Sequence, residues 1–331
     1  MRVRRREFIS LLTGAAAGVV LPAVAQAPKK AVVALVLTGI SDSEMAGSDP
    51  AFAPARAFVH ELRALGWVEG QTISIERRTL AGNAAYAPSL LSELLAHGVD
   101  VIVLGGARWL HDAALNATRT TPIVTLFQDD PVAAGLITSL SRPGGNLTGV
   151  AQTTGPEFFR KRLQLLKEIA PRVARPALLG PRGVLEQDRN LPGTAGVNVI
   201  AVQVDVAEDL DAAFDTIRRE RADGLLVAGS AITYRYYDRI VAFSAENTLP
   251  AIHAFREAVE AGGLLSYGTS IPGIFRQMAR LTDRILKGSR PQDLPTEQAT
   301  SFELVLNAKT AKILGLMVPP TMLAVANEVI E

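Results

Sequence analysis

Short apolar runs alternate with segments of helical periodicity along most of the chain. The first run, Ala31–Leu37, reads AVVALVL, which is typical of a strand buried on both faces. The predicted strands lie at residues 31–37, 73–77, 101–104, 123–126, 147–150, 177–179, 197–204, 224–228, 250–253, 263–267 and 300–306. The predicted helices lie at residues 50–65, 86–96, 107–117, 131–141, 158–169, 210–221, 236–246, 257–261 and 271–286, and two short helices around Pro319-Pro320 end the chain.

This alternation predicts a fold of the α/β class, because parallel strands need helical crossovers that cover both faces of a sheet. The pattern is interrupted at Arg142-Pro-Gly-Gly-Asn146, where proline and glycine end a helix and Leu147 begins a new strand. A chain of 331 residues is also long enough for two domains. We therefore expect two doubly wound parallel-sheet lobes with a ligand site at their junction.

The N-terminal segment has the pattern of an export signal. Basic residues lead into an apolar run at residues 8–21, which is broken by Pro22 and followed by Ala23-Val24-Ala25. Arg5-Arg6-Glu7-Phe8-Ile9 matches the twin-arginine pattern, although a basic start also serves the general secretory route. We expect residues 1–25 to be removed after Ala25, with an uncleaved anchor as the alternative. The sequence has no cysteine, so disulfides and a lipid-anchored cysteine are excluded, and a soluble periplasmic protein is expected.

Charge and aromatic content argue against nucleic acid as a partner. The formal net charge is +1, but the arginines of residues 2–7 dominate it, and without that segment, which also contains Glu7, 30 basic and 32 acidic residues remain. A nearly neutral body does not attract polyanions, and an aromatic content of 5% offers few side chains for base stacking.

The candidate ligand-binding residues follow the predicted strands. In open parallel sheets, ligands bind beyond the carboxyl ends of the strands, where loops and helix N-termini meet. The residues selected by this rule are Thr38, Gly39, Gly105, Gly106, Ala107, Asp129, Asp130, Gln152, Thr153, Ser230, Tyr234 and Tyr267.

Each candidate also has a structural interpretation. Gly105-Gly106 opens a helix whose N–H groups are suited to a carboxylate, or it forms a tight turn with nothing bound. Asp130 precedes Pro131 and is suited to cap a helix. Asp129 has no such capping role, and it either pairs with a ligand ammonium or is a solvated loop carboxylate. The hydroxyls of Ser230, Tyr234 and Tyr267 serve either a ligand or the local fold.

No catalytic constellation is visible. The four histidines, at positions 60, 97, 111 and 253, are scattered, and the carboxylates define no acid–base pair. The sequence contains neither G-x-S-x-G nor H-E-x-x-H, and it lacks G-x-G-x-x-G and Walker A phosphate-binding loops. We therefore expect a protein that is not an enzyme and that binds no metal or cofactor.

Several motifs together resemble those of a known family, the ABC-transporter substrate-binding proteins that include tryptophan- and tyrosine-binding members. The resemblance covers nearly the whole chain. The motifs are Arg5-Arg6-Glu7-Phe8-Ile9, Leu65-Gly-Trp-Val-Glu-Gly70, Asp130-Pro-Val132 with Gly135, Arg142-Pro-Gly-Gly-Asn146, Leu165-Leu-Lys-Glu-Ile-Ala-Pro171, Gly262-Gly-Leu-Leu-Ser-Tyr-Gly268, Ile285-Leu-Lys-Gly288, Leu294-Pro295 and Leu314-Gly-Leu316 with Pro319-Pro320.

The resemblance implies a type I periplasmic-binding fold, in which two lobes joined by three hinge crossings close over one small ligand. It places residues 31–148 and 263–292 in the first lobe, and residues 149–262 and 293–331 in the second. It implies as partners a small-molecule ligand and the permease and ATPase subunits of an importer, and we expect the chain to be a monomer. The ligand suggested by the candidate groups is an amino acid or a small aromatic carboxylate.

The sequence departs from the family pattern near the predicted cleft. Residues 181–196 contain Pro192-Gly193 and look short for the regular helix that the family has there, so the sequence leaves the structure of this segment open. Gly229-Ser230 replaces a common Asp-Pro, His253 replaces a common Tyr, and Asp129 replaces a usual Ser. The ligand of relatives therefore does not transfer directly. Two other functions remain open, namely an exported α/β enzyme and a ligand-sensing domain for a membrane sensor.

Arg142 to Asn146 is expected to be a turn without a ligand role, and residues 147–152 are expected to form the first hinge crossing. Replacing Gly149 with proline should then impair closure and leave each lobe folded. Ligand titration and small-angle X-ray scattering test this, and an unchanged affinity and scattering profile would contradict it.

Overall fold

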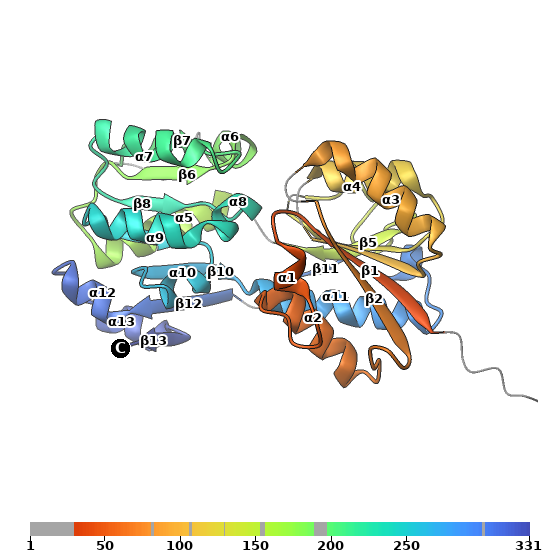
Figure 1. Ribbon diagram of the computed structural model, residues 1–331. Coiled ribbons are helices and arrows are strands. Elements are labelled where there is room, and N and C mark those ends of the chain that lie inside the picture. Colours follow the sequence, from red (N-terminus) through yellow and green to blue (C-terminus); the bar gives the residue numbers. More distant parts are fainter. Residues whose placement is uncertain are drawn as a thin grey trace, which may run out of the picture.

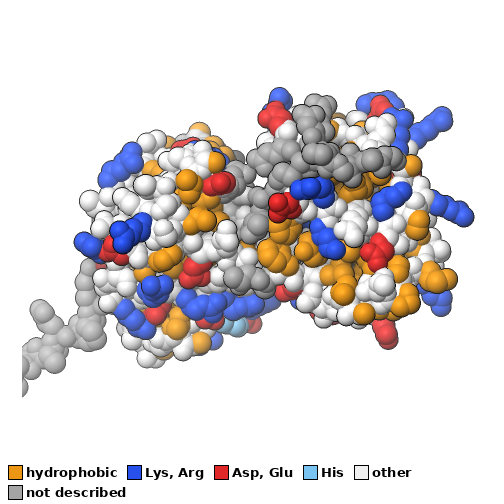
Figure 2. Space-filling model, turned by 180° about the vertical axis from the view of Figure 1, so that it is seen from behind, with side chains coloured by type: hydrophobic (Ala, Val, Ile, Leu, Met, Phe, Trp, Pro, Cys, Tyr) orange, Lys and Arg blue, Asp and Glu red, His pale blue; other side chains and the backbone are white. Residues whose placement is uncertain are grey.

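The computed structural model describes residues 30–80, 83–105, 108–128, 130–152, 156–188, 197–299 and 302–331. These residues form two α/β lobes that lie side by side (Figure 1), as the strand–helix alternation predicts. Seen from behind, both lobes carry Lys and Arg side chains interspersed with Asp and Glu (Figure 2). Within the described ranges, no helix combines the length and the apolar character needed to cross a bilayer.

The first lobe is built on a parallel sheet with the strand order β11-β5-β4-β3-β1-β2. Its strands are β1 (Ala31–Leu37), β2 (Ile73–Thr79), β3 (Val101–Gly105), β4 (Ile123–Phe127), β5 (Leu147–Ala151) and β11 (Glu297–Gln298). Helices α2 (Ala53–Ala64) and α11 (Ile271–Leu286) cover one face, and α3 (Ala87–Ala96) and α4 (Arg108–Ala117) cover the other. Because both faces are covered, β3 and β4 are buried along their whole length.

The second lobe contains a sheet with the order β13-β12-β10-β9-β8-β6-β7, in which β10 and β12 pair antiparallel and the other described neighbours pair in parallel. Its strands are β6 (Ala177–Gly180), β7 (Ile200–Gln203), β8 (Leu225–Val227), β9 (Ala251–His253), β10 (Leu265–Thr269), β12 (Phe302–Asn307) and β13 (Glu328–Ile330). Helix α5 (Pro156–Ile169) covers one face, and α7 (Asp209–Arg219) and α9 (Tyr237–Glu246) cover the other. The short helices are α1 (Asp42–Met45), η1 (Ala84–Tyr86), α6 (Arg182–Asp188), α8 (Ala231–Arg235), α10 (Arg256–Glu260), η2 (Pro291–Asp293), α12 (Ala308–Ile313) and α13 (Pro320–Val325).

Both lobes repeat one connectivity. The order β2-β1-β3-β4-β5 in the first lobe corresponds to β7-β6-β8-β9-β10 in the second. In each sheet the strand order reverses beside the first strand, between β1 and β3 and between β6 and β8. Ligands of doubly wound sheets bind at such switch points, beyond the carboxyl ends of the strands. The topology therefore predicts a ligand site at the loops after these strands.

The chain passes between the lobes later than the sequence limits at 148, 262 and 292 imply. Residues 149–151 continue β5 in the first sheet, and β10 belongs to the second sheet, so the second crossing lies at Ser270. Strand β11 pairs with β5, so the third crossing comes after Gln298. The reason is that each strand keeps its ladder of hydrogen bonds to the end of the sheet before the chain leaves it.

One local expectation was wrong. Residues 131–141 form turns in place of a helix, because the N–H groups of Leu136 and Ile137 both bond to the carbonyl of Pro131 and the chain folds back. In the segment whose structure the sequence left open, a helix forms at Arg182–Asp188. Its first N–H, that of Arg182, donates to the Asp205 carboxylate at 3.0 Å. Residues 189–196 lie outside the described residues.

The segment Arg142 to Asn146 is a turn, as predicted. Gly144 has a φ of 86°, a conformation that glycine adopts without strain. The Asn146 side-chain amide donates to the carbonyl of Thr121 at 2.7 Å, and the Asn146 carbonyl accepts from the N–H of Ile123 at 2.7 Å. These bonds hold the loop that precedes β4. The motif Arg142 to Asn146 therefore has a role in the local structure.

The motif Leu65-Gly-Trp67 joins two segments that are far apart in the sequence. Gly66 has a φ of 97°, which turns the chain at the end of α2. The indole N–H of Trp67 then donates to the Asp283 carboxylate on α11 at 2.8 Å. Asp283 is buried and also pairs with Lys287. This contact fixes α11 to the first lobe, although the chain enters α11 from the second.

Gly149 is a packing constraint inside β5, which changes the expected effect of substituting it. A Cβ atom at this position would lie 1.9 Å from the carbonyl oxygen of Thr125 on β4. We expect Gly149→Ala to destabilise the first lobe by about 2 kcal/mol or more, because the strands must move apart. Gly145→Ala is the matched control, since its Cβ would meet nothing within 4 Å. Urea unfolding measures both, and equal stability of the two variants would contradict this assignment.

Candidate ligand-binding cleft

A cleft lies between the carboxyl ends of the two sheets. Its empty volume is about 550 Å³, including space open to solvent. The lining combines residues of both lobes with Gln152 at the first crossing. The lining residues are Leu37, Thr38, Ile40, Phe52, Gly105, Leu126, Gln128, Gln152, Ser230, Ala231, Tyr234, Arg235, Phe255, Ile271 and Phe275. A cleft of this size with mostly apolar walls and a few polar groups is typical of a small-molecule site.

The first-lobe wall is formed by the ends of β1 and β3 and by α11. The N–H of Thr38 donates to the carbonyl of Gly105, which aligns the two strand ends. A Cβ on Gly105 would lie 2.5 Å from Leu37 Cδ2 and 2.9 Å from Phe275 Cζ. A larger residue here would therefore displace the Leu37 and Phe275 side chains, which pack directly against the backbone of Gly105.

Gln152 stands at the boundary between the lobes. Its N–H continues the sheet by donating to the carbonyl of Phe127 at 2.8 Å. Its side-chain amide donates to the hydroxyl of Thr269 at 3.1 Å, and both side chains are buried. The bond connects the end of β5 with the end of β10, so Gln152 joins two crossings and also faces the cleft.

Ser230 forms the start of the second-lobe wall. It is the N-cap of α8, and its hydroxyl oxygen accepts from the N–H of Thr233 at 3.3 Å. The Thr233 side chain in turn accepts from the N–H of Ser230, which completes a capping box. Ser230 therefore has a structural role in the described structure and also lines the cleft.

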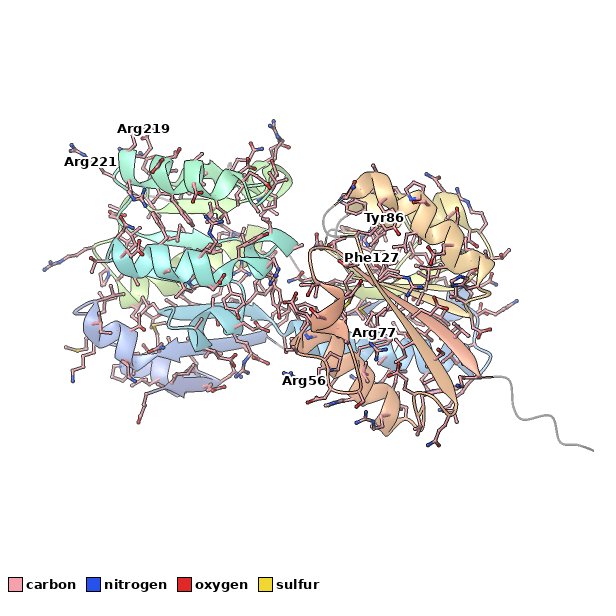
Figure 3. All side chains as sticks on the ribbon, in the orientation of Figure 1. Arg56, Arg77, Tyr86, Phe127, Arg219 and Arg221 are labelled. Carbon is pink, nitrogen blue, oxygen red and sulfur yellow. The ribbon has the colours of Figure 1, made fainter. Side chains whose placement is uncertain are left out.

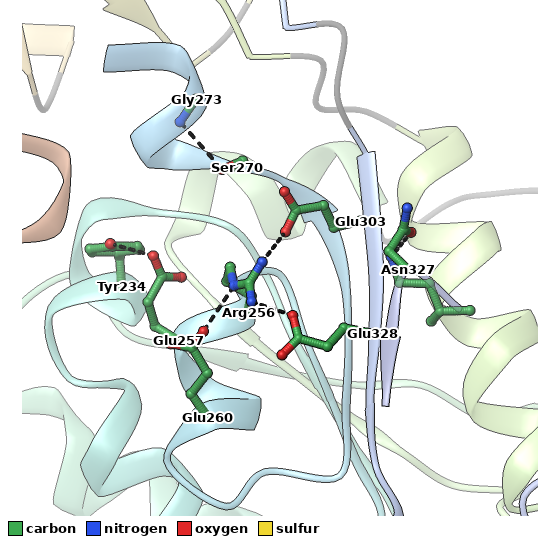
Figure 4. Close-up of polar contacts among 10 residues, drawn as sticks. Tyr234, Arg256, Glu257, Glu260, Ser270, Gly273, Glu303, Asn327 and Glu328 are labelled. Carbon is green, nitrogen blue, oxygen red and sulfur yellow. Dashed lines mark hydrogen bonds and ion pairs between the residues drawn. The ribbon is translucent and has the colours of Figure 1, made fainter. Parts of the chain in front are cut away.

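Tyr234 provides an aromatic surface that touches both lobes. Its ring meets Phe255 edge-on at a centroid distance of 4.8 Å and Phe52 of the first lobe at 6.0 Å. The hydroxyl donates to the Glu257 carboxylate at 2.8 Å (Figure 4). Burial, followed by the charge of Glu257, raises the pKa of Tyr234, and burial also raises the pKa of Glu257. The hydrogen bond to Glu257 thus fixes the Tyr234 ring, which packs against Phe255 and Phe52.

Arg235 is the charged side chain of the described lining. Its Nη1 atom lies 3.3 Å from the Glu44 carboxylate, which belongs to α1 of the first lobe. The guanidinium carbon lies 6.0 Å from the centre of the Tyr236 ring. This ion pair spans the two lobes at the cleft.

The structure brings together part of the predicted site. Thr38, Gly105, Gln152, Ser230 and Tyr234 line the cleft. Gly39, Asp130 and Tyr267 are not among the lining residues. Gly106, Ala107, Asp129 and Thr153 lie outside the described residues, so their predicted roles stay predictions.

Local contacts account for Asp130 and Tyr267. The Asp130 carboxylate accepts from the N–H groups of Val132 at 2.9 Å and Ala133 at 3.1 Å, so its role is structural, but it caps a turn and not the predicted helix. The Tyr267 ring stacks with Phe158 at 6.0 Å and with Phe302 at 6.5 Å. Its position at the end of the predicted strand 263–267 was misleading, because β10 continues to Thr269.

Sequence reasoning missed most of the apolar lining. Phe255 and Ile271 come just after strands, so the rule of strand ends could have found them. Phe275 lies one turn inside α11, and Phe52 lies just before α2. No local signal identifies these two, because their place at the cleft depends on how α2 and α11 pack on the first lobe.

Arg256 is the first residue of α10, which follows β9, and its guanidinium is occupied within the second lobe. It pairs with Glu260, Glu303 and Glu328 (Figure 4). Burial by itself lowers the pKa of Arg256, but the hydrogen bonds to Glu260 and Glu328 outweigh it and raise the pKa. The cluster ties α10 to β12 and β13.

The fold and the cleft define a class of protein: a two-lobed ligand-binding protein of the type I periplasmic-binding fold. The chain belongs to the family described as ABC transporter substrate binding protein, whose model matches residues 48–330. The family is one of solute-binding proteins, and the resemblance found in the sequence motifs is confirmed.

Individual relatives are distant. The chain is 23% identical over 267 residues to a tyrosine-binding protein of Clostridioides difficile (strain R20291), an alignment that covers 79% of this chain and 76% of that protein. A conserved domain protein from Vibrio cholerae superposes with a TM-score of 0.79 at 25% identity, over 91% of this chain and 100% of that one. The ABC domain from Streptococcus pneumonia in complex with L-Trp superposes with a TM-score of 0.77 at 22% identity, over 91% of this chain and 100% of that one. The structural likeness supports the fold.

Two buried histidines make the stability of the protein depend on pH. His111 contacts the Thr125 hydroxyl at 2.8 Å, and His253 is 1% exposed. Burial, followed by the charge of Arg108 for His111 and of Arg162 for His253, lowers the pKa of each to about 4. Both rings are therefore neutral in the folded protein at neutral pH.

Between pH 6.5 and 4, we expect the unfolded chain to bind more protons at these rings than the folded chain, so stability falls as the pH falls. The loss should reach about 2 kcal/mol for each histidine by pH 5. Urea unfolding at pH 7.5 and 5 tests this, and His253→Gln should remove its share of the difference. If wild type and this variant lose the same stability, the assignment to His253 is wrong.

Proposed function

We propose that the chain is the substrate-binding component of an ABC importer, capturing one small ligand between its lobes and closing around it. The observation that carries this proposal is the cleft itself, whose described walls come from both lobes. A ligand in such a cleft contacts both lobes when they are together, so its binding free energy favours the closed arrangement.

The three crossings support a hinge at this place. Gln152 ends the first sheet, Ser270 is the single residue between β10 and α11, and Ala299 follows β11. The side chain of Gln152 bonds to Thr269, and the N–H of Ala299 bonds to the carbonyl of Ala151 at 3.0 Å. The crossings therefore lie next to one another, and small backbone rotations there can move one lobe against the other.

For the ligand, we propose an amino acid or a small aromatic carboxylate. The described lining is largely apolar and includes the rings of Phe52, Tyr234, Phe255 and Phe275, which suits an aromatic or aliphatic body. A tyrosine-binding protein and a structure in complex with L-Trp among the relatives support the same class. The proposed ammonium partner is Asp129.

The remaining parts of the proposal concern transport. We propose export by residues 1–25, a periplasmic location, and delivery of the ligand by a monomer to a permease with its ATPase. The family match to ABC transporter substrate binding proteins supports such partners. N-terminal sequencing of the exported protein tests the signal, and a mature chain beginning at Gln26 is expected.

We expect an amino acid or aromatic acid to raise the melting temperature of the protein and to reduce its radius of gyration in solution. A thermal-shift screen, then calorimetry and small-angle scattering, measures this. Ala231→Phe should abolish binding by filling the cleft, whereas Ala242→Phe, on an exposed position of α9 in the same lobe, should not. The receptor proposal fails if no member of the screen stabilises the protein.

A further inference from the structure

We infer that Arg235 recognises the anionic group of the ligand and that Glu44 positions Arg235 by an ion pair across the cleft. The inference rests on the proposed function and deepens it by naming the chemical group of the ligand, an anion, that the site recognises. In place of the amide groups at the start of α4, which the sequence suggested, it assigns the ligand carboxylate to a side chain of the second lobe.

The distribution of charge in the cleft leads to Arg235. Among the described lining residues, Arg235 carries the formal charge, and its neighbours in the lining are apolar or neutral polar side chains. Its side chain is 42% exposed, so it stands at the rim. A ligand with an apolar body and a carboxylate then places its body between the aromatic rings. Its charge remains at the rim, where desolvation costs least.

Glu44 is itself held in place. One carboxylate oxygen, Oε2, accepts from the N–H of Ser41 at 3.0 Å and from the Ser41 hydroxyl at 2.7 Å. The Glu44 N–H in turn donates to the Ser41 hydroxyl oxygen, which completes the capping box of α1. The other oxygen, Oε1, faces Nη1 of Arg235 at 3.3 Å. The hydrogen bonds from Ser41, with a smaller contribution from Arg235, lower the pKa of Glu44, so the carboxylate stays charged at neutral pH.

The ion pair is suited to orienting the guanidinium. Exposed ion pairs contribute little stability, so this pair alone does not hold the lobes together. A guanidinium offers five N–H donors in a planar fork, and the contact with Glu44 is made through one of its nitrogens. With Nη1 directed at Glu44 and the guanidinium carbon 6.0 Å from the centre of the Tyr236 ring, Arg235 can bind a carboxylate through its other N–H groups.

Other arginines are placed differently. Arg219 and Arg221 project from the end of the second lobe that is remote from the first (Figure 3). Arg256 is engaged by three carboxylates of its own lobe (Figure 4). Arg235 differs because it ends α8, the short helix that follows β8 at the cleft.

The test compares carboxylates with their neutral amides in calorimetric titrations. The probes are L-tryptophan with L-tryptophanamide, indole-3-acetate with indole-3-acetamide, and phenylacetate with phenylacetamide. For a carboxylate that binds wild type, Arg235→Gln should lower the affinity about tenfold or more, because a charged hydrogen bond is lost. The affinity for the amide should change little. Glu44→Gln should lower the affinity for the carboxylate by a smaller factor, again without changing the affinity for the amide.

Arg219→Gln, at the remote end of the same lobe, serves as the control and should behave as wild type. Circular dichroism and melting of each variant show that it is folded. Equal losses for carboxylate and amide in Arg235→Gln would mean that Arg235 acts on lobe closure, and the inference would be wrong. An unchanged carboxylate affinity would place the carboxylate elsewhere and also overturn it. If no probe binds wild type, the proposed ligand class itself fails, and the inference fails with it.

Discussion

The buried hydrogen bond between the Gln152 amide and the Thr269 hydroxyl joins the ends of β5 and β10, where the chain passes between the lobes. The third crossing lies beside it, because Ala299 bonds to Ala151. A buried side-chain amide needs such partners, so the crossings are kept together. As a result, the carboxyl ends of the two sheets face each other, and the loops of both lobes meet in one cleft.

The cleft also depends on a helix that enters from the other lobe. Helix α11 begins one residue after β10 of the second sheet and packs beside α2 on the first. The bond from Trp67 to Asp283 fixes it there, and its Phe275 ring then reaches the cleft against Gly105. The apolar wall is therefore a product of packing between segments separated by more than a hundred residues in the sequence.

Part of the site was predictable because strand ends are predictable. Gly105 ends a buried strand, Thr38, Gln152 and Ser230 come after buried strands, and the rule for parallel sheets places such residues at the cleft. Asp130 before Pro131 was predicted to cap a helix, but no helix forms there, and its carboxylate caps a turn instead. Tyr267 was misplaced because apolar runs locate a strand to within a few residues only, and two residues of error move a side chain from the sheet to the loop.

The sequence by itself determined the α/β class, the order of most strands and helices, and the family. Strands buried on both faces and the family motifs can each be recognised within a short stretch of sequence. The tertiary structure alone decided where the chain changes lobes, that residues 131–141 turn without forming a helix, and that Phe52 and Phe275 reach the cleft. It alone brought Glu44 within 3.3 Å of Arg235. Hydrophobic periodicity shows which face of an element is buried, but it does not show which distant element buries it.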